Sequence, residues 1–190
     1  GVTTVQVAGT DKDVIFDIRK DLRAGRPSMA RLYTSGQGLV FKGGYGGLYG
    51  LNVPVGTPEE ARKAVAEQAA KGVDFIKIWM DDERRMIPVK MTYEVSKAAI
   101  DEAHKHNLKV MAHVYYLDDA KELVRQGVDG FGHIVRDQDV DKELMDMMKA
   151  KGTWQMSSTL SREIVYSMAI MPWINDPFFT RGVTPGTLAA

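Results

Sequence analysis

Three side chains that can act as bases or metal ligands, Lys77, His113 and His133, lie in short apolar segments of the chain. The lysine lies in VDFIKIWMDD (73–82), and the histidines lie in VMAHVYY (110–116) and GFGHIVRD (130–137). Neutral imidazoles are common ligands of zinc and similar metals. An ammonium group in an apolar segment is costly unless something compensates it. We therefore expect Lys77 either to reach water or to carry chemistry.

The segments around these residues alternate between predicted helices and predicted strands. Thr57, Pro58 and Glu60 together indicate the start of a helix with a capping box. Strict alternation of helix, short turn and apolar strand is typical of right-handed crossovers in a parallel sheet. The sequence predicts strands at 1–9, 28–38, 73–80, 108–116, 128–137 and 153–161, and helices, each closed by a turn residue, at 13–25, 57–72, 92–107, 118–127 and 139–152.

Two architectures fit this alternation, an open doubly wound sheet or part of a (β/α)₈ barrel. The glycine-rich GGYGGLYG (43–50) lacks the Lys-Ser/Thr ending of a phosphate-binding loop, so we expect a flexible loop over a site. Polar residues at the ends of successive strands favour the barrel, where the carboxyl ends of the strands meet at one pocket. A whole barrel needs ~250 residues, so we expect an internal piece of a longer protein.

The composition narrows the classes of partner. The 190 residues include 25 basic and 25 acidic side chains, so no net charge favours nucleic acid or an anionic membrane surface. The absence of cysteine excludes disulfides, thiolate catalysis and cysteine metal sites within this chain. The chain begins with GVTTVQVAG, which predicts a strand, and a signal peptide is neither shown nor excluded.

The segments FIKIWMDD, VMAHVYY and GFGHIVRD, in this order and at these separations, resemble the metal-dependent amidohydrolase superfamily, in particular its imidazolonepropionase-like and prolidase-like branch. The opening GVTTV is similar to the second barrel strand of that family, and the likeness extends to about Ser161. The resemblance implies an α/β fold, a partial (β/α)₈ TIM barrel with roughly strands 2 to 7. Residues 1–190 would form a single incomplete barrel domain, with clear βα units in 1–160 and a looser helical segment in 161–190.

The same resemblance implies a hydrolase of amide or other C–N bonds, possibly dipeptidase-like, that uses a metal-activated water. Lys77, His113 and His133 would hold one or two divalent ions, zinc above all, with Lys77 N-carboxylated to an anionic oxygen ligand. The substrate would be a small molecule or a dipeptide-like compound. The His-x-His pair of the family's first strand has no counterpart here. The catalytic aspartate is expected downstream of Ala190, and Asp176 is a poor substitute for it.

Two further residues are candidates for substrate binding, Tyr115 and Arg136. Strand alternation places Tyr115 on the same side as His113, and makes Tyr116 a packing residue. Arg136 follows His133 closely and could bind a substrate carboxylate through two hydrogen bonds, or form a surface ion pair.

The remaining polar residues of these segments have expected roles outside the metal cage. Asp81 and Asp82 end the lysine strand, and we expect them to be loop residues or to support the metal ligands. His104 and His106 end a predicted helix, where a cation suits the helix dipole, and we interpret both as structural. Ser158 marks the end of a strand and is expected to line the pocket.

Two other functions are compatible with the sequence. A lysine on an apolar barrel strand can have a lowered pKa and form a Schiff base with a carbonyl substrate, as in aldolase-type lyases. Alternatively, the chain is a non-catalytic fragment that self-associates, because a six-strand arc leaves two open edges and exposes an apolar face. We therefore also expect a homo-oligomer or a complementing chain as partner.

Overall fold

The computed structural model describes residues 2–26, 30–46, 50–82, 84–156 and 176–181. The chain divides into two compact units, residues 1–156 and residues 157–190, which are described separately. In the second unit the structure describes the short helix α7 (Pro177–Thr180). Ser158 and most of the predicted looser segment 161–190 lie outside the described residues.

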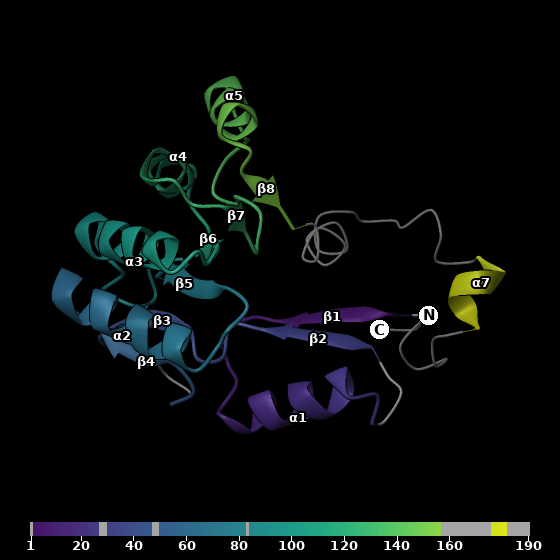
Figure 1. The fold of residues 1–190 in the computed structure, drawn as a ribbon. Coiled ribbons are helices and arrows are strands. Elements are labelled where there is room, and N and C mark those ends of the chain that lie inside the picture. The colour runs from purple at the N-terminus through teal and green to yellow at the C-terminus, as the bar shows by residue number, and fades with distance from the viewer. Residues whose placement is uncertain (1, 27–29, 47–49, 83, 157–175, 182–190) are drawn as a thin grey trace. The chain divides into compact units, whose positions relative to one another are not determined.

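The strands of the first unit form two sheets whose strand pairs are all parallel (Figure 1). Strands β1 (Thr4–Val7) and β2 (Arg31–Thr34) form the smaller sheet. The larger sheet has the order β4-β3-β5-β6-β7-β8. Its strands are β3 (Leu39–Phe41), β4 (Val53–Val55), β5 (Ile76–Met80), β6 (Val110–Val114), β7 (Gly130–Phe131) and β8 (Trp154–Gln155). The predicted α/β class with a parallel sheet is confirmed.

The helices between the strands begin and end close to the predicted positions. The turn residues Gly72, Asn107, Gly127 and Gly152 all have left-handed backbones, with φ between 57° and 97°, a conformation that favours glycine and asparagine. Among the described residues, no helix is long and apolar enough to cross a membrane. The helices are α1 (Val14–Arg23), α2 (Pro58–Ala70), α3 (Tyr93–Lys105), α4 (Leu117–Gln126) and α5 (Lys142–Lys151).

Between the predicted strand 28–38 and the predicted helix 57–72 lie two strands that were not predicted from the sequence, β3 and β4. They pair with each other, and β3 also pairs with β5 through Leu39 and Ile78. Each is only three residues long, too short for a clear alternating pattern. Pro54 interrupts the second one, but it is tolerated because β4 lies at the edge of the sheet.

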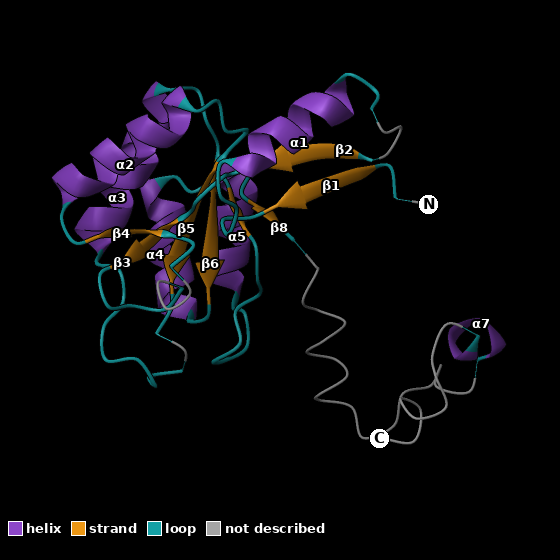
Figure 2. Ribbon diagram, turned by 90° about the horizontal axis from the view of Figure 1, so that it is seen from below, coloured by secondary structure: helices purple, strands orange, loops and turns teal. Residues whose placement is uncertain are grey.

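Successive side chains of the central strands point to opposite faces of the larger sheet. One set packs with the helices in the main hydrophobic core: Ile76, Ile78, Met80, Val110, Ala112 and Val114. Figure 2 shows α2 and α3 on that side of the sheet. The alternate residues of β5 and β6, Lys77, Trp79, Met111 and His113, therefore point to the opposite face.

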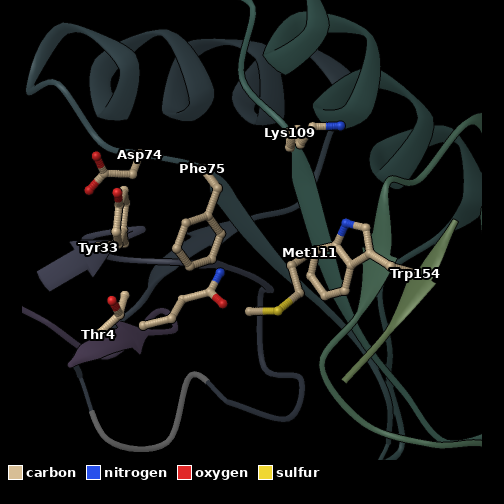
Figure 3. A pocket seen from close by; sticks show the side chains of 8 residues that line it. Thr4, Tyr33, Asp74, Phe75, Lys109, Met111 and Trp154 are labelled. Carbon is tan, nitrogen blue, oxygen red and sulfur yellow. The ribbon is translucent and has the colours of Figure 1, made fainter. Parts of the chain in front are cut away.

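That opposite face contains a cavity of ≈ 290 Å³ at the amino ends of the central strands (Figure 3). Phe75, Met111 and Trp154 turn toward it from three different segments. A Cβ on Gly130 would lie 2.2 Å from the ring of Trp154, so only glycine leaves room for that indole. The cavity is lined by Thr4, Gln6, Tyr33, Asp74, Phe75, Lys109, Met111 and Trp154, and so by none of the candidate metal ligands.

Asp74, just before β5, joins three elements through charged hydrogen bonds. Its carboxylate accepts from the guanidinium groups of Arg19 at 2.6 Å and Arg23 at 2.9 Å, both on α1. It also accepts from the backbone N–H of Thr34, at the end of β2, at 2.9 Å. Arg19 is 8% exposed and donates a further bond to the carbonyl of Gly72. This network fixes the smaller sheet and α1 against the start of the lysine strand.

Replacing Asp74 with asparagine should lower the free energy of unfolding by about 1.5–3 kcal/mol, the range for hydrogen bonds to charged groups. The change keeps the size of the side chain but leaves the buried guanidinium of Arg19 without its counter-charge. Urea unfolding followed by circular dichroism measures the effect. As a control, Asp21→Asn removes an exposed carboxylate 3.7 Å from Arg26 and should change stability by less than about 0.5 kcal/mol. Equal effects of the two changes would contradict a structural role for the Asp74 network.

Candidate functional site

Lys77 is buried inside the sheet, with 3% of its surface exposed. It is the second residue of β5, so the expectation that it closes the strand is wrong. Its Nζ donates to the carbonyl oxygen of Ile78 at 3.3 Å and lies 4.4 Å from the centre of the Trp79 ring. Burial lowers the pKa of Lys77 well below its ordinary value, and the charge of Asp81 only partly opposes this. The ammonium form is thus disfavoured, and the amine is neutral at lower pH than an exposed lysine.

The indole of Trp79 lies against Lys77 because two glycines leave space for it. A Cβ on Gly9 would come within 2.5 Å of the Trp79 ring and 2.8 Å of the Lys77 side chain. A Cβ on Gly38 would come within 2.4 Å of the same ring. Gly9 has in addition a φ of 101°, which L side chains rarely adopt. The segments after β1 and β2 therefore form one wall of the lysine environment.

His113 lies beside Lys77 on the neighbouring strand. It is the fourth residue of β6, pairs with Trp79 in the β5–β6 register, and is 6% exposed. Its Nε2 lies 2.6 Å from Oδ2 of Asp81. Burial lowers the pKa of His113 well below its ordinary value, and the positive charges of Lys77 and Arg136 add to the effect. The imidazole is therefore neutral at physiological pH.

His133 follows β7 and packs against His113, with 4.3 Å between the two ring centroids. Burial, with smaller contributions from His113, Lys77 and Arg136, lowers the pKa of His133 to about 3. Its Nδ1 is buried and has no hydrogen-bond partner among the residues that the structure describes. The structure thus brings the three predicted ligands close enough together for Lys77 and His113 to lower the pKa of His133.

Two further residues belong to this environment: Asp81, for which the sequence left open a loop position or a role in supporting the metal ligands, and Tyr45, which was not assigned to the site. Asp81 is 3% exposed and contacts His113 directly. The signal was available, because Asp81 follows Lys77 by four residues and an even spacing puts both on the same face of an extended strand. The ring of Tyr45 lies 5.3 Å from that of His113. Tyr45 belongs to the glycine-rich segment, whose sequence predicted a loop over a site but no particular contact.

Tyr115 and Arg136, the predicted substrate contacts, pack against each other near Asp81. The Arg136 guanidinium lies 4.9 Å from the centre of the Tyr115 ring. Its Nη2 is 4.0 Å from Oδ2 of Asp81, and the side chain is 17% exposed. In the structure Arg136 thus forms an ion pair with the buried Asp81. Whether the two residues bind substrate stays a prediction.

Tyr116 and Asp82 pair with each other beyond the ends of β6 and β5. The Tyr116 hydroxyl donates to Oδ1 of Asp82 at 2.6 Å. Burial, followed by the nearby charge of Asp82, raises the pKa of Tyr116 to about 12. This agrees with the predicted packing role of Tyr116. A cavity of ≈ 450 Å³ opens beside the pair and is lined by Arg84, Arg85, Tyr115, Tyr116, Asp137 and Gln138.

The two histidines interpreted as structural lie at the end of α3 and form partly exposed ion pairs. Nε2 of His104 is 2.9 Å from Oδ2 of Asp129, and Nε2 of His106 is 3.4 Å from Oε1 of Glu102. These contacts agree with a structural role. Asp176 is exposed in the second unit.

The donor set fits a divalent metal only if Lys77 contributes to it. Within the described ranges, no three histidine, cysteine, aspartate or glutamate side chains are grouped closely enough to hold an ion. Two neutral imidazoles are nevertheless in contact, and the buried Nδ1 of His133 has an unused lone pair or proton. A neutral lysine next to them can become an anionic ligand by carboxylation. We therefore regard the set as compatible with a metal once Lys77 is modified.

Comparison with known proteins gives a relative in sequence and several in structure. No family model matches the chain. An uncharacterized protein from Mycobacterium bovis is 33% identical over 87 residues, which cover 44% of this chain and 24% of that protein. The structure of an Xaa-Pro dipeptidase with bound methionine in its active site superposes with a TM-score of 0.70 at 23% identity, over 87% of this chain and 44% of that one. An amidohydrolase structure superposes with a TM-score of 0.67 at 21% identity, over 90% of this chain and 46% of that one.

The two structural likenesses show the α/β fold that the resemblance to the amidohydrolase superfamily implied. The chain shares this fold with the Xaa-Pro dipeptidase structure and the amidohydrolase structure. It spans about a quarter of the curated relative and less than half of either solved structure.

The low pKa of His133 makes stability depend on pH in a defined direction. Its folded value of about 3 lies below the value of about 6.5 for an exposed imidazole. Between these values the unfolded chain binds the additional proton, so the free energy of unfolding falls as pH falls. His133→Gln removes this titration, and its stability should decline less steeply with acid than that of the wild type. Urea unfolding at several pH values from about pH 7 to about pH 4 measures how steeply the free energy of unfolding declines in the wild type and in His133→Gln.

As a control, Gln138→Ala changes an exposed, uncharged residue of the same loop. Its free energy of unfolding should depend on pH as steeply as that of the wild type. If His133→Gln loses stability as steeply as the wild type, then His133 is not buried as a neutral imidazole.

Proposed function

We propose that this chain carries part of the active site of a metal-dependent hydrolase that cleaves amide or other C–N bonds. The observation that carries the proposal is the cluster of Lys77 and His113, buried on the paired strands β5 and β6, with the half-buried His133, which packs on His113 just after β7. Active sites of (β/α)₈ enzymes lie at the carboxyl ends of the strands. The proposal includes a partial barrel of roughly strands 2 to 7, and zinc as the ion.

The burial of the lysine favours the protonation state that carboxylation requires. Carbon dioxide adds to an unprotonated amine: a bond forms between Nζ and the carbon, one proton leaves, and an anionic carbamate results. Burial lowers the pKa of Lys77 and so favours the neutral amine. The carbamate oxygens, His113 and His133 would then hold the ion. When bound, the metal would lower the pKa of a water molecule and polarise the carbonyl group of the substrate.

The remaining residues of the site have roles in binding and enclosure. Arg136, stacked on Tyr115, presents a cation to a carboxylate of a dipeptide-like substrate. Tyr45 packs on His113 and keeps water from that side of the imidazole. The family's His-x-His pair and catalytic aspartate have no counterpart in residues 1–190, so the complete reaction needs groups from outside them. Substrate class, metal and mechanism all belong to the proposal.

Elemental analysis should find at least about one equivalent of zinc per chain, after purification without chelator from zinc-supplemented medium. His113→Ala should lose that zinc, because it removes a ligand from the centre of the cluster. With ¹³C-labelled bicarbonate, the wild type should give a carbamate carbon signal that Lys77→Ala lacks.

His106→Ala is the matched control, since it removes an imidazole that is 40% exposed and should leave the zinc content unchanged. Trapping by borohydride in the presence of a ketone or aldehyde tests the alternative, a Schiff-base lyase, which the lowered pKa of Lys77 also favours. A covalent adduct on Lys77 without bound zinc would replace the hydrolase proposal by the lyase.

Self-association is proposed as well, with a second copy of the chain as the partner. Strands β4 and β8 lie at the two edges of the larger sheet, and an edge strand presents backbone groups that can pair with another chain. The apolar-lined cavity of Figure 3 lies on the same open face. Size-exclusion chromatography with light scattering should show a dimer or larger species. A single monomer peak at all concentrations would contradict this.

A further inference from the structure

Asp81 differs from the other polar residues of the site because it contacts one nitrogen of a proposed metal ligand. Its Oδ2 is 2.6 Å from Nε2 of His113, and both side chains are buried, at 3% and 7% exposure. Its other oxygen, Oδ1, accepts the backbone N–H of Asp82 at 2.7 Å. Nη2 of Arg136 lies 4.0 Å from Oδ2. The carboxylate is therefore held from several sides and not free to rotate away from the imidazole.

The short distance shows a hydrogen bond and not a shared metal. Two atoms that each lie about 2.0–2.3 Å from a tetrahedral zinc ion are more than about 3 Å apart. At 2.6 Å, Oδ2 of Asp81 and Nε2 of His113 have no room for an ion between them. A carboxylate only accepts hydrogen bonds, so Nε2 carries the proton and donates it. The other ring nitrogen, Nδ1, then has a free lone pair.

From this geometry we infer that Asp81 is a positioning residue, which fixes the tautomer and the ring orientation of His113 and leaves Nδ1 as the nitrogen that would bind a metal ion. Carboxylates that accept a hydrogen bond from the second nitrogen of a histidine ligand orient the ring and raise its basicity. The inference rests on the proposed metal function and assigns to this chain a determinant of metal affinity outside the ligands. Asp82, the next residue, cannot substitute for it, because its Oδ1 accepts from the hydroxyl of Tyr116 instead.

The test compares Asp81→Asn with Asp82→Asn, two neighbouring changes of equal size and charge. Zinc affinity, measured by competition with a chromophoric chelator, should fall about 10–100-fold in Asp81→Asn and stay within about threefold in Asp82→Asn. Far-UV circular dichroism and thermal unfolding establish that both variants fold. Equal zinc affinity of Asp81→Asn and the wild type would overturn the inference.

A second readout does not depend on metal. The ¹⁵N chemical shifts of the histidine rings in the zinc-free chain identify the tautomer, with His113→Gln used for assignment. The wild type should show His113 protonated at Nε2, and Asp81→Asn should show a mixture of tautomers, because an amide can both donate and accept. Protonation at Nδ1 in the wild type would refute the inference. If the wild type binds no zinc, the proposed hydrolase function fails for this chain, whereas the tautomer still decides the role of Asp81.

Discussion

The two-sided burial of strand β5 is the constraint on which the rest of the site depends. All five of its residues are buried, but for two different reasons. Ile76, Ile78 and Met80 contribute to the core with the helices, and this apolar packing fixes the register of the strand. Lys77 and Trp79 then have to occupy the opposite face. Burial of an amine destabilises the fold. Apolar packing on the helix side of β5 offsets this destabilisation.

The electrostatics of the site follow from the burial of several basic side chains close to one another. Burial lowers the pKa values of Lys77, His113 and His133, and each positive charge makes the next one less favourable. Neutral bases are what metal binding and carboxylation require. Asp81 is the nearby carboxylate, and it is directed to one imidazole by its own hydrogen bonds. The result is a cluster of electron-pair donors with little net charge.

Much of this arrangement could be predicted from the sequence, and the reasons for the failures are local. Gly72, Asn107, Gly127 and Gly152 marked the helix ends correctly, because a left-handed turn restricts the choice of residue. Strands β3 and β4 were missed, since three residues do not make a pattern. The depth of Lys77 within its strand depends on where pairing with β6 stops, which no local signal reveals. The contact of Tyr45 depends on a loop path that sequence alone does not define.

The glycines around Trp79 have a consequence for the order in which the molecule can assemble. Residues 9, 38 and 79 are far apart in sequence, yet their close packing encloses the amine of Lys77. Contacts between distant residues form only after loop closure, and their entropic cost slows folding. The surroundings of Lys77 are therefore complete only when the segments after β1 and β2 pack against Trp79. The enclosure of the amine is thus a property of the assembled chain and not of the strand that carries it.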